Sequence, residues 1–190
     1  MTGTDHHTPA AEVRVDGPLP PGYRRVATGR VREVVGLGYH EFTVGLIIEH
    51  RPGRTVTDTD NLLGTMLTGN PAPIHTDAHY AAQTPWGRIL VCSAVTLGIV
   101  AGMTVRSTSG LTTANLGLDE VRFTRPVFVG DTLYADTEIL SLRPSNSRPD
   151  DGIVTCATTA HNQHGEQVLR YRRTFLVPRD PDRVRDATHY

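Results

Sequence analysis

Residues 70–93 read Asn-Pro-Ala-Pro-Ile-His-Thr-Asp-Ala-His-Tyr-Ala-Ala-Gln-Thr-Pro-Trp-Gly-Arg-Ile-Leu-Val-Cys-Ser, and the rest of the chain is organised around them. The first two prolines restrict the backbone and bias the residues before them to extended conformations. They predict a stiff loop that presents His75 at its end. The following segment, Thr76–Ala82, holds good helix formers after a capping residue and predicts a short helix.

A turn and a long apolar helix are expected after this loop. Thr84–Gly87 predicts the turn, and the apolar run Ile89–Met103 predicts a buried helix. Backbone N–H groups at a helix start can hold a developing negative charge while a histidine moves a proton. Histidine exchanges protons near neutral pH, so His75 is a catalytic candidate. From spacing alone, a hydrogen-bonded structural histidine explains the residue at least as well.

The chain before this loop predicts a strand, a turn and a helix. Leu46–His50 reads as the strand and Arg51–Arg54 as the turn. Thr57 with an acidic residue three positions later forms a capping box, which predicts a helix start. The apolar residues that follow at helical spacing are Leu62, Leu63, Met66 and Leu67.

The chain after the long helix predicts several antiparallel strands. Val121–Phe123 alternates and begins one, and Thr132–Ser141, Ile153–His161 and Gln167–Val177 are the others. Residues 162–166 have the composition of a hairpin loop. One long buried helix followed by antiparallel strands is an α+β layout, with an antiparallel sheet wrapped around the helix.

Composition excludes several classes of function. The net charge of −1 argues against a nucleic-acid-binding protein. All 19 basic residues are arginine, so Schiff-base chemistry on a lysine is excluded. The two cysteines, Cys92 and Cys156, have neither metal-ligand spacing nor a disulfide framework, which fits a reducing cytoplasm. No metal or redox cofactor is expected, and the longest apolar run is too short to span a bilayer.

The motifs quoted above resemble the signature of the MaoC-like hydratases, single-domain hot-dog proteins in which an Asp-x-Asn-Pro-Ile-His-x-Asp loop precedes the central helix. Gly38–Gly45 is similar to the opening strand of that family, and Phe123–Leu133 to its later strand-turn-strand. Within the family, Thr68–His75 and Ser147–Val154 look most like the itaconyl- and mesaconyl-CoA hydratase group. The resemblance implies a hot-dog fold. Because the sequence has no internal repeat, a double hot-dog requires two chains, and a homodimer or dimer of dimers is expected.

The resemblance assigns proton transfer to His75, and it exposes one departure from the family. The family aspartate that shares activation of water is replaced here by Asn70, which cannot act as a general base. Either His75 alone moves the proton while Asn70 holds the water, or the site handles a thioester in another way. Ser93 stands where the family has a glycine whose backbone N–H polarises the thioester carbonyl, a role that serine retains.

The remaining site candidates are less specific. Asp77 either orients the histidine or starts a helix, and Tyr80 follows the motif beside it. Trp86 and Gly87 are expected to shape the acyl pocket, or only to form the turn. Arg125 and Arg148 are candidates for binding coenzyme A phosphates, because arginine forks match phosphate geometry.

The resemblance therefore implies a cytoplasmic hydratase or dehydratase that acts on a small branched or dicarboxylic enoyl-CoA, with no cofactor beyond the coenzyme A or carrier-protein thioester of the substrate. The alternatives are a thioesterase, an enzyme that adds an amine to the double bond, and a non-catalytic acyl-CoA-binding protein. The expected organisation is a flexible arm over residues 1–22, a hot-dog domain over 23–180 and a C-terminal tail over 181–190. No contact with nucleic acid or membrane is expected.

Overall fold

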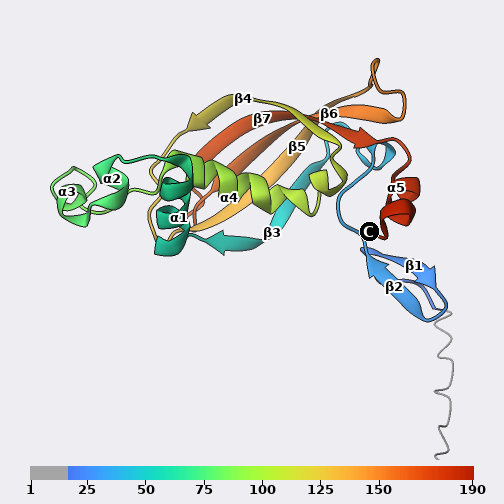
Figure 1. Cartoon of the computed structure of the whole chain (residues 1–190), viewed down its shortest axis with the longest axis horizontal. Helices are drawn as coiled ribbons and strands as arrows, with labels where there is room; N and C mark the ends of the chain where they lie inside the picture. The colour runs from blue at the N-terminus through green and yellow to red at the C-terminus, as the bar shows by residue number, and fades with distance from the viewer. Residues whose placement is uncertain (1–16) are drawn as a thin grey trace, which may run out of the picture.

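The computed structural model describes residues 17–190, so most of the arm expected at residues 1–22 lies outside the described residues. Five antiparallel strands form the main sheet in the order β3-β5-β6-β7-β4. They span β3 (Ile47–Thr55), β4 (Ala114–Phe123), β5 (Thr132–Pro144), β6 (Asp151–His161) and β7 (Gln167–Pro178). Helix α4 (Ser93–Val105) lies across one face of this sheet (Figure 1). The α+β fold is confirmed, and it is the hot-dog arrangement.

The core lies between α4 and the sheet because the long strands present apolar side chains to the helix. Val100 of α4 packs in one buried cluster with Leu133, Leu169 and Tyr171 of the sheet. A second buried cluster, around Phe175, lies further toward the carboxyl end of β7 than Leu169 and Tyr171 of the first cluster. The hairpin predicted at residues 162–166 is confirmed, since it joins β6 to β7.

Helix α1 (Asp58–Thr68) begins and ends as its sequence predicts. Thr57 caps it by accepting a hydrogen bond from the backbone N–H of Asp60, and Gly69 ends it with a φ of 61°. At Gly64 the helix approaches Val95 of α4 so closely that a Cβ atom would not fit. The helix nevertheless buries its polar residues Asn61 and Thr65. Its apolar residues face outward, with exposed fractions of 53–87% for Leu62, Leu63, Met66 and Leu67.

Two expected elements before α1 are wrong. The family's opening strand is replaced at Tyr39–Glu41 by a 3-10 helix, because the Glu41 carboxylate accepts the Gly38 backbone N–H at 2.6 Å and closes a turn. The turn expected at Arg51–Arg54 is part of strand β3. There the pairing with β5 shifts register between His50 and Arg54, so a bulge absorbs the Pro-Gly pair without ending the strand.

Two boundaries after α1 also differ from expectation. The expected long helix begins at Ser93 rather than near Ile89, because Leu90 pairs with Phe128 as an isolated β-bridge. Val121–Phe123 ends strand β4 rather than beginning a strand. The earlier part of β4 escaped prediction because its register shifts twice, between Asn115 and Gly117 and between Asp119 and Arg122, which interrupts the alternation. A short 3-10 helix, Ser109–Leu111, precedes it.

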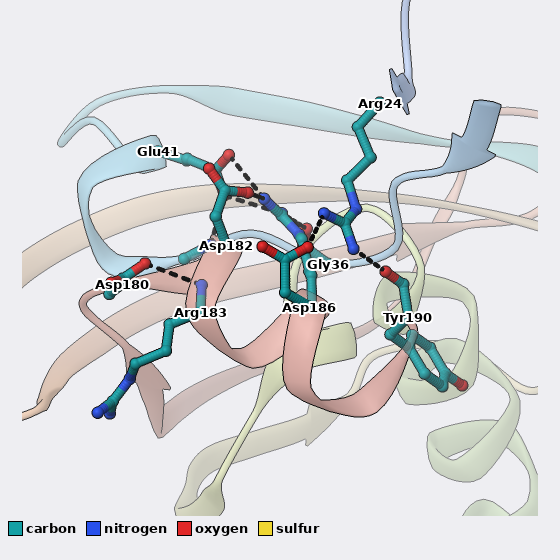
Figure 2. Close-up of polar contacts among 10 residues, drawn as sticks. Arg24, Gly36, Glu41, Asp180, Asp182, Arg183, Asp186 and Tyr190 are labelled. Atoms are coloured by element: carbon teal, nitrogen blue, oxygen red, sulfur yellow. Dashed lines mark hydrogen bonds and ion pairs between the residues drawn. The ribbon is translucent and has the colours of Figure 1, made fainter. Parts of the chain in front are cut away.

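The two ends of the described chain meet outside the main sheet. Strands β1 (Tyr23–Ala27) and β2 (Arg30–Glu33) form a separate hairpin. The segment expected as a C-terminal tail contains helix α5 (Pro181–Thr188), which lies beside this hairpin in Figure 1. Arg24 joins the two through the Asp186 carboxylate at 2.6 Å and the Tyr190 carbonyl at 2.9 Å, as Figure 2 shows.

Arg185 is the buried centre of this contact. Its guanidinium donates to the Gly36 carbonyl at 3.0 Å and forms ion pairs with Glu41 at 3.1 Å and Asp182 at 3.2 Å. Only 5% of the Arg185 side chain is exposed, so water contributes little to satisfying these groups. The same arginine therefore holds α5 to the 3-10 helix at Tyr39–Glu41.

Replacing Arg185 with alanine is expected to lower the free energy of unfolding by about 2–4 kcal/mol, because it leaves the buried Gly36 carbonyl without its donor and removes the ion pairs with Glu41 and Asp182. Arg183→Ala is the matched control on the same helix. Its side chain is 64% exposed and pairs only with the exposed Asp150, so a change of about 0.5 kcal/mol or less is expected. Urea unfolding of the two variants measures the difference. Equal losses would contradict the role assigned to Arg185.

A row of polar side chains also crosses the core beneath α4. The ring of His50, which is 2% exposed, hydrogen-bonds with the hydroxyl groups of Ser107 and Thr137, both at 2.7 Å. The Thr137 hydroxyl in turn bonds to that of Thr158 at 2.8 Å. Burial lowers the pKa of His50, and the nearby Asp136 carboxylate opposes this effect. The lowered pKa favours the neutral ring, whose two nitrogens are both satisfied by the hydroxyl groups of this row.

Candidate active site

His75 lies in a short helix rather than at the end of a loop. Helix α2 (Pro73–Thr76) starts with proline at its first position, where a missing N–H costs nothing, and His75 is its third residue. The ring is half-buried, and its Nδ1 lies 2.7 Å from the Leu90 carbonyl oxygen. Because a carbonyl only accepts hydrogen bonds, Nδ1 carries the proton in this contact. The lone pair is therefore on Nε2, which is the form that a general base requires.

Leu90 ties the histidine to the start of the central helix. Its backbone N–H donates to the Ile74 carbonyl at 3.1 Å, and the next N–H, that of Val91, donates to Val127 at 2.9 Å. Cys92 then caps α4 and Ser93 is the first helical residue. The N–H groups of a first helical turn have no acceptor within the helix and lie at the positive end of its dipole. Ser93 N–H is thus a donor suited to a thioester oxygen.

Asn70 lies between these two parts of the site. Its Oδ1 accepts the backbone N–H of Ala72 at 3.1 Å, and its Nδ2 donates to the Cys92 sulfur at 3.3 Å. One N–H of the amide and one lone pair of Oδ1 remain after these contacts. The amide is therefore held in one orientation and still has one donor and one acceptor for a further ligand.

A cavity of about 290 Å³ opens beside the start of α4. Its lining includes Ser93, Thr96, Trp86, Phe123 and Arg125. A second cavity, of about 510 Å³, shares Arg125 and Pro126 with the first and is lined by Arg88. A larger cavity of about 590 Å³ lies between the β1–β2 hairpin and β3, and none of the predicted site residues lines it.

The structure settles the local role of Asp77. Its carboxylate accepts the backbone N–H of Tyr80 at 2.9 Å, so it caps helix α3 (Ala78–Ala82), and the short helix expected here is confirmed. Of the two alternatives for Asp77, the helix start is the one that forms, and the Nδ1 of His75 bonds to the Leu90 carbonyl. Tyr80 is 48% exposed. Gly87 adopts a φ of 67°, and its N–H donates to Thr84 at 3.0 Å, so the predicted turn is confirmed.

The two predicted arginines lie far apart. Arg125 lines both cavities near Ser93 and lies 3.6 Å from the Glu166 carboxylate. Arg148 follows the far end of β5, a strand of 13 residues that spans roughly 40 Å, and pairs with Asp151 at 3.9 Å. Within one chain, the structure does not bring Arg148 together with His75 or Ser93.

Sequence reasoning missed two residues of this region. Arg88 lies with its guanidinium 3.9 Å from the centre of the Phe128 ring, at the second cavity. Asn61 of α1 is buried against the site. Its spacing of four residues from Thr65 places the two on one helix face, and that polar face was the available signal.

Across residues 17–190, no group of three or more His, Cys, Asp or Glu side chains is placed to hold a metal ion. None of the helices in the described part of the chain is long and apolar enough to cross a membrane. Burial raises the pKa of the Cys156 thiol to about 11, so this cysteine stays protonated near neutral pH.

The chain is similar in sequence and fold to several known hydratases and dehydratases. The chain is 33% identical over 145 residues to the β-methylmalyl-CoA dehydratase of Chloroflexus aurantiacus, and 32% identical over 142 residues to the mesaconyl-CoA hydratase of Cereibacter sphaeroides. These matches cover 76% and 75% of this chain but only 41% of each relative, so the chain spans about two fifths of their length. The R-hydratase PhaJ1 of Pseudomonas aeruginosa superimposes with a TM-score of 0.66 at 29% identity, covering 77% of this chain and 89% of that one.

Residues 41–162 match the family described as MaoC like domain, and this range contains the His75 helix, the start of α4 and all the residues that line the cavity of about 290 Å³ beside it. The match covers more than half of the 190 residues. The chain is therefore a member of the MaoC-like domain family.

Proposed function

We propose that this chain is an enoyl-thioester hydratase or dehydratase that acts on a small branched or dicarboxylic acyl-CoA. The observation that carries the proposal is the hydrogen bond from His75 Nδ1 to the Leu90 carbonyl. It leaves Nε2 of the neutral ring free to act as a base, and it ties the ring to Leu90, shortly before Ser93 begins α4. The names of the two curated relatives support a branched C5 acyl group of the mesaconyl type.

In the proposed reaction, His75 Nε2 takes a proton from water as the water oxygen bonds to the β-carbon of the double bond. The electron pair moves to the thioester oxygen, where the Ser93 N–H stabilises the enolate. The protonated His75 then returns its proton to the α-carbon, so the hydrated product forms with no net change to the enzyme. The remaining donor and acceptor of Asn70 orient the water. No cofactor takes part beyond the thioester carrier.

The proposed enzyme is a homodimer in the cytoplasm. Strand β4 is an edge of the sheet, and its Leu116, Leu118 and Phe123 are 40–50% exposed. Phe123 also lines the cavity beside Ser93, so a second copy on this edge would close the site. Both cysteines are free thiols, in keeping with a reducing compartment.

The proposal is tested by incubating the full chain with mesaconyl-, itaconyl- and crotonyl-CoA. The loss of the enoyl absorbance band measures turnover. We expect hydration, with the branched C5 substrates preferred, and activity that survives dialysis against EDTA. Release of free thiol instead of hydration would identify a thioesterase, and consumption of the band only with added amine would identify amine addition. Thermal stabilisation by butyryl-CoA without any turnover would identify an acyl-CoA-binding protein. Each of these three outcomes overturns the hydratase assignment. Light scattering of the same sample tests the dimer.

A further inference from the structure

Asn61 is a buried polar residue of α1 that links both halves of the site. Only 4% of it is exposed. Its Nδ2 donates to the His75 carbonyl at 2.8 Å, and its Oδ1 accepts the Cys92 backbone N–H at 2.9 Å. One side chain therefore bridges the helix that carries the candidate base and the residue that caps α4.

The amide group is matched to these two partners. A carbonyl needs a donor and an N–H needs an acceptor, and asparagine supplies both within one rigid, planar group. The bond with Cys92 is buried and the bond with His75 is partly buried, so the loss of a partner would carry a cost. The distance between His75 and Cys92 is thereby held by a short side chain that has few rotamers.

The same two partners are joined by a second route. The Leu90 carbonyl holds the His75 ring, and residues 90–92 lead to the start of α4. Movement of the α2 backbone away from Asn61 would carry the ring away from Leu90. Asn61 bonds to the His75 backbone rather than to its ring, so its effect on the ring passes through the α2 backbone.

We infer that Asn61 is a positioning residue that fixes His75 in its Nδ1–H form and at a set separation from the Ser93 N–H. The effect on the ring follows from the geometry alone. The effect on turnover rests on the hydratase function proposed above.

The discriminating variants are Asn61→Asp and Asn61→Ala, with Thr65→Val as the matched control. Aspartate keeps an acceptor for the Cys92 N–H but cannot donate to the His75 carbonyl, so it weakens only the histidine side of the bridge. Alanine removes both bonds. Thr65 is equally buried one turn later on α1, and its hydroxyl donates only to the Leu62 carbonyl of the same helix. Thr65→Val thus reports the cost of losing a buried bond in α1 without touching the bridge.

The first readout is the ring tautomer of His75, measured by long-range ¹H–¹⁵N NMR on the folded, full-length protein. We expect the Nδ1–H form in the wild type and in Thr65→Val, and a shift toward the Nε2–H form in Asn61→Asp. Retention of the wild-type tautomer in Asn61→Asp overturns the inference. If Asn61→Ala does not fold, the comparison of Asn61→Asp with Thr65→Val still decides.

The second readout is turnover of the substrate found for the wild type. Asn61→Asp is expected to lower kcat about 10- to 100-fold with KM changed less than about 2-fold, since small misplacements of a catalytic group have effects of this size. Thr65→Val is expected to keep wild-type kcat. A wild type that hydrates no enoyl-CoA overturns the proposed function and leaves the tautomer test standing. An equal loss of kcat in Thr65→Val overturns the positioning role.

Discussion

His75→Ala is expected to lower kcat for enoyl-CoA hydration by about 10³-fold, because removal of a general acid–base group typically costs 10²–10⁴-fold. The ring contacts the protein through Nδ1, so its loss removes the base at Nε2 without removing a core residue. Asn70 has no basic atom, so it cannot take over the role of base when His75 is removed. Steady-state rates over a range of pH measure the effect, and the limb of the profile that reports a basic group should disappear.

His79→Ala is the matched control for this prediction. His79 lies four residues later on α3, where its ring is exposed and contacts the Gln83 amide at 3.0 Å. Its removal should change kcat less than about 2-fold, as expected for a histidine that moves no proton in the reaction. If His75→Ala keeps more than about a tenth of the wild-type rate, or if both variants lose activity equally, His75 is not the base.

Ser93→Pro is expected to lower kcat by about 10²–10³-fold, the usual cost of removing one oxyanion donor. Proline has no backbone N–H, yet it is well tolerated at the first position of a helix, which is where Ser93 lies. The preceding residue, Cys92, has φ −60° and ψ 135°, an extended conformation that accepts a following proline. The substitution therefore removes the proposed donor and leaves the helix intact.

Ser93→Ala separates the backbone N–H from the hydroxyl group. It keeps the N–H, so activity within about 3-fold of the wild type is expected if the backbone is the donor. Circular dichroism and thermal unfolding of Ser93→Pro verify that α4 persists. Wild-type kcat in a folded Ser93→Pro would exclude the Ser93 N–H from the reaction, and a large loss in Ser93→Ala would assign the role to the hydroxyl.

Local signals in the sequence predicted the elements whose ends are fixed by neighbouring residues. The Thr57–Asp60 capping box, the Gly87 turn and the hairpin at residues 162–166 all form as expected, since each depends on side chains a few positions apart. The 3-10 helix at Tyr39–Glu41 is closed by an equally local contact, from the Gly38 N–H to the Glu41 carboxylate, but the family resemblance favoured a strand there. Its contact with Arg185, which is 144 residues away in the chain, could not be read from the local sequence.

The orientation of α1 was also beyond local reasoning. Apolar spacing identified the helix but did not reveal that Leu63 and Met66 face outward while Asn61 faces inward. Burial of Asn61 depends on two backbone groups, at His75 and Cys92, that only the folded chain brings together. For the same reason, the sequence and the family resemblance pointed to His75 as the candidate base but not to the Leu90 carbonyl that bonds to its Nδ1.

The contact between the β1–β2 hairpin and α5 has a consequence for trimming the protein. Both pieces lie outside the family match at residues 41–162, so each looks dispensable when a minimal domain is designed. Deletion of α5 and the residues after it alone would remove the Asp186 and Tyr190 partners of Arg24, and the Arg185 partner of Glu41. Deletion of the residues before 30 alone would remove Arg24 and leave Asp186 without this ion pair. The two ends therefore depend on each other, and because Arg185 of α5 also holds the Gly36 carbonyl and the Glu41 carboxylate, a workable minimal version keeps both.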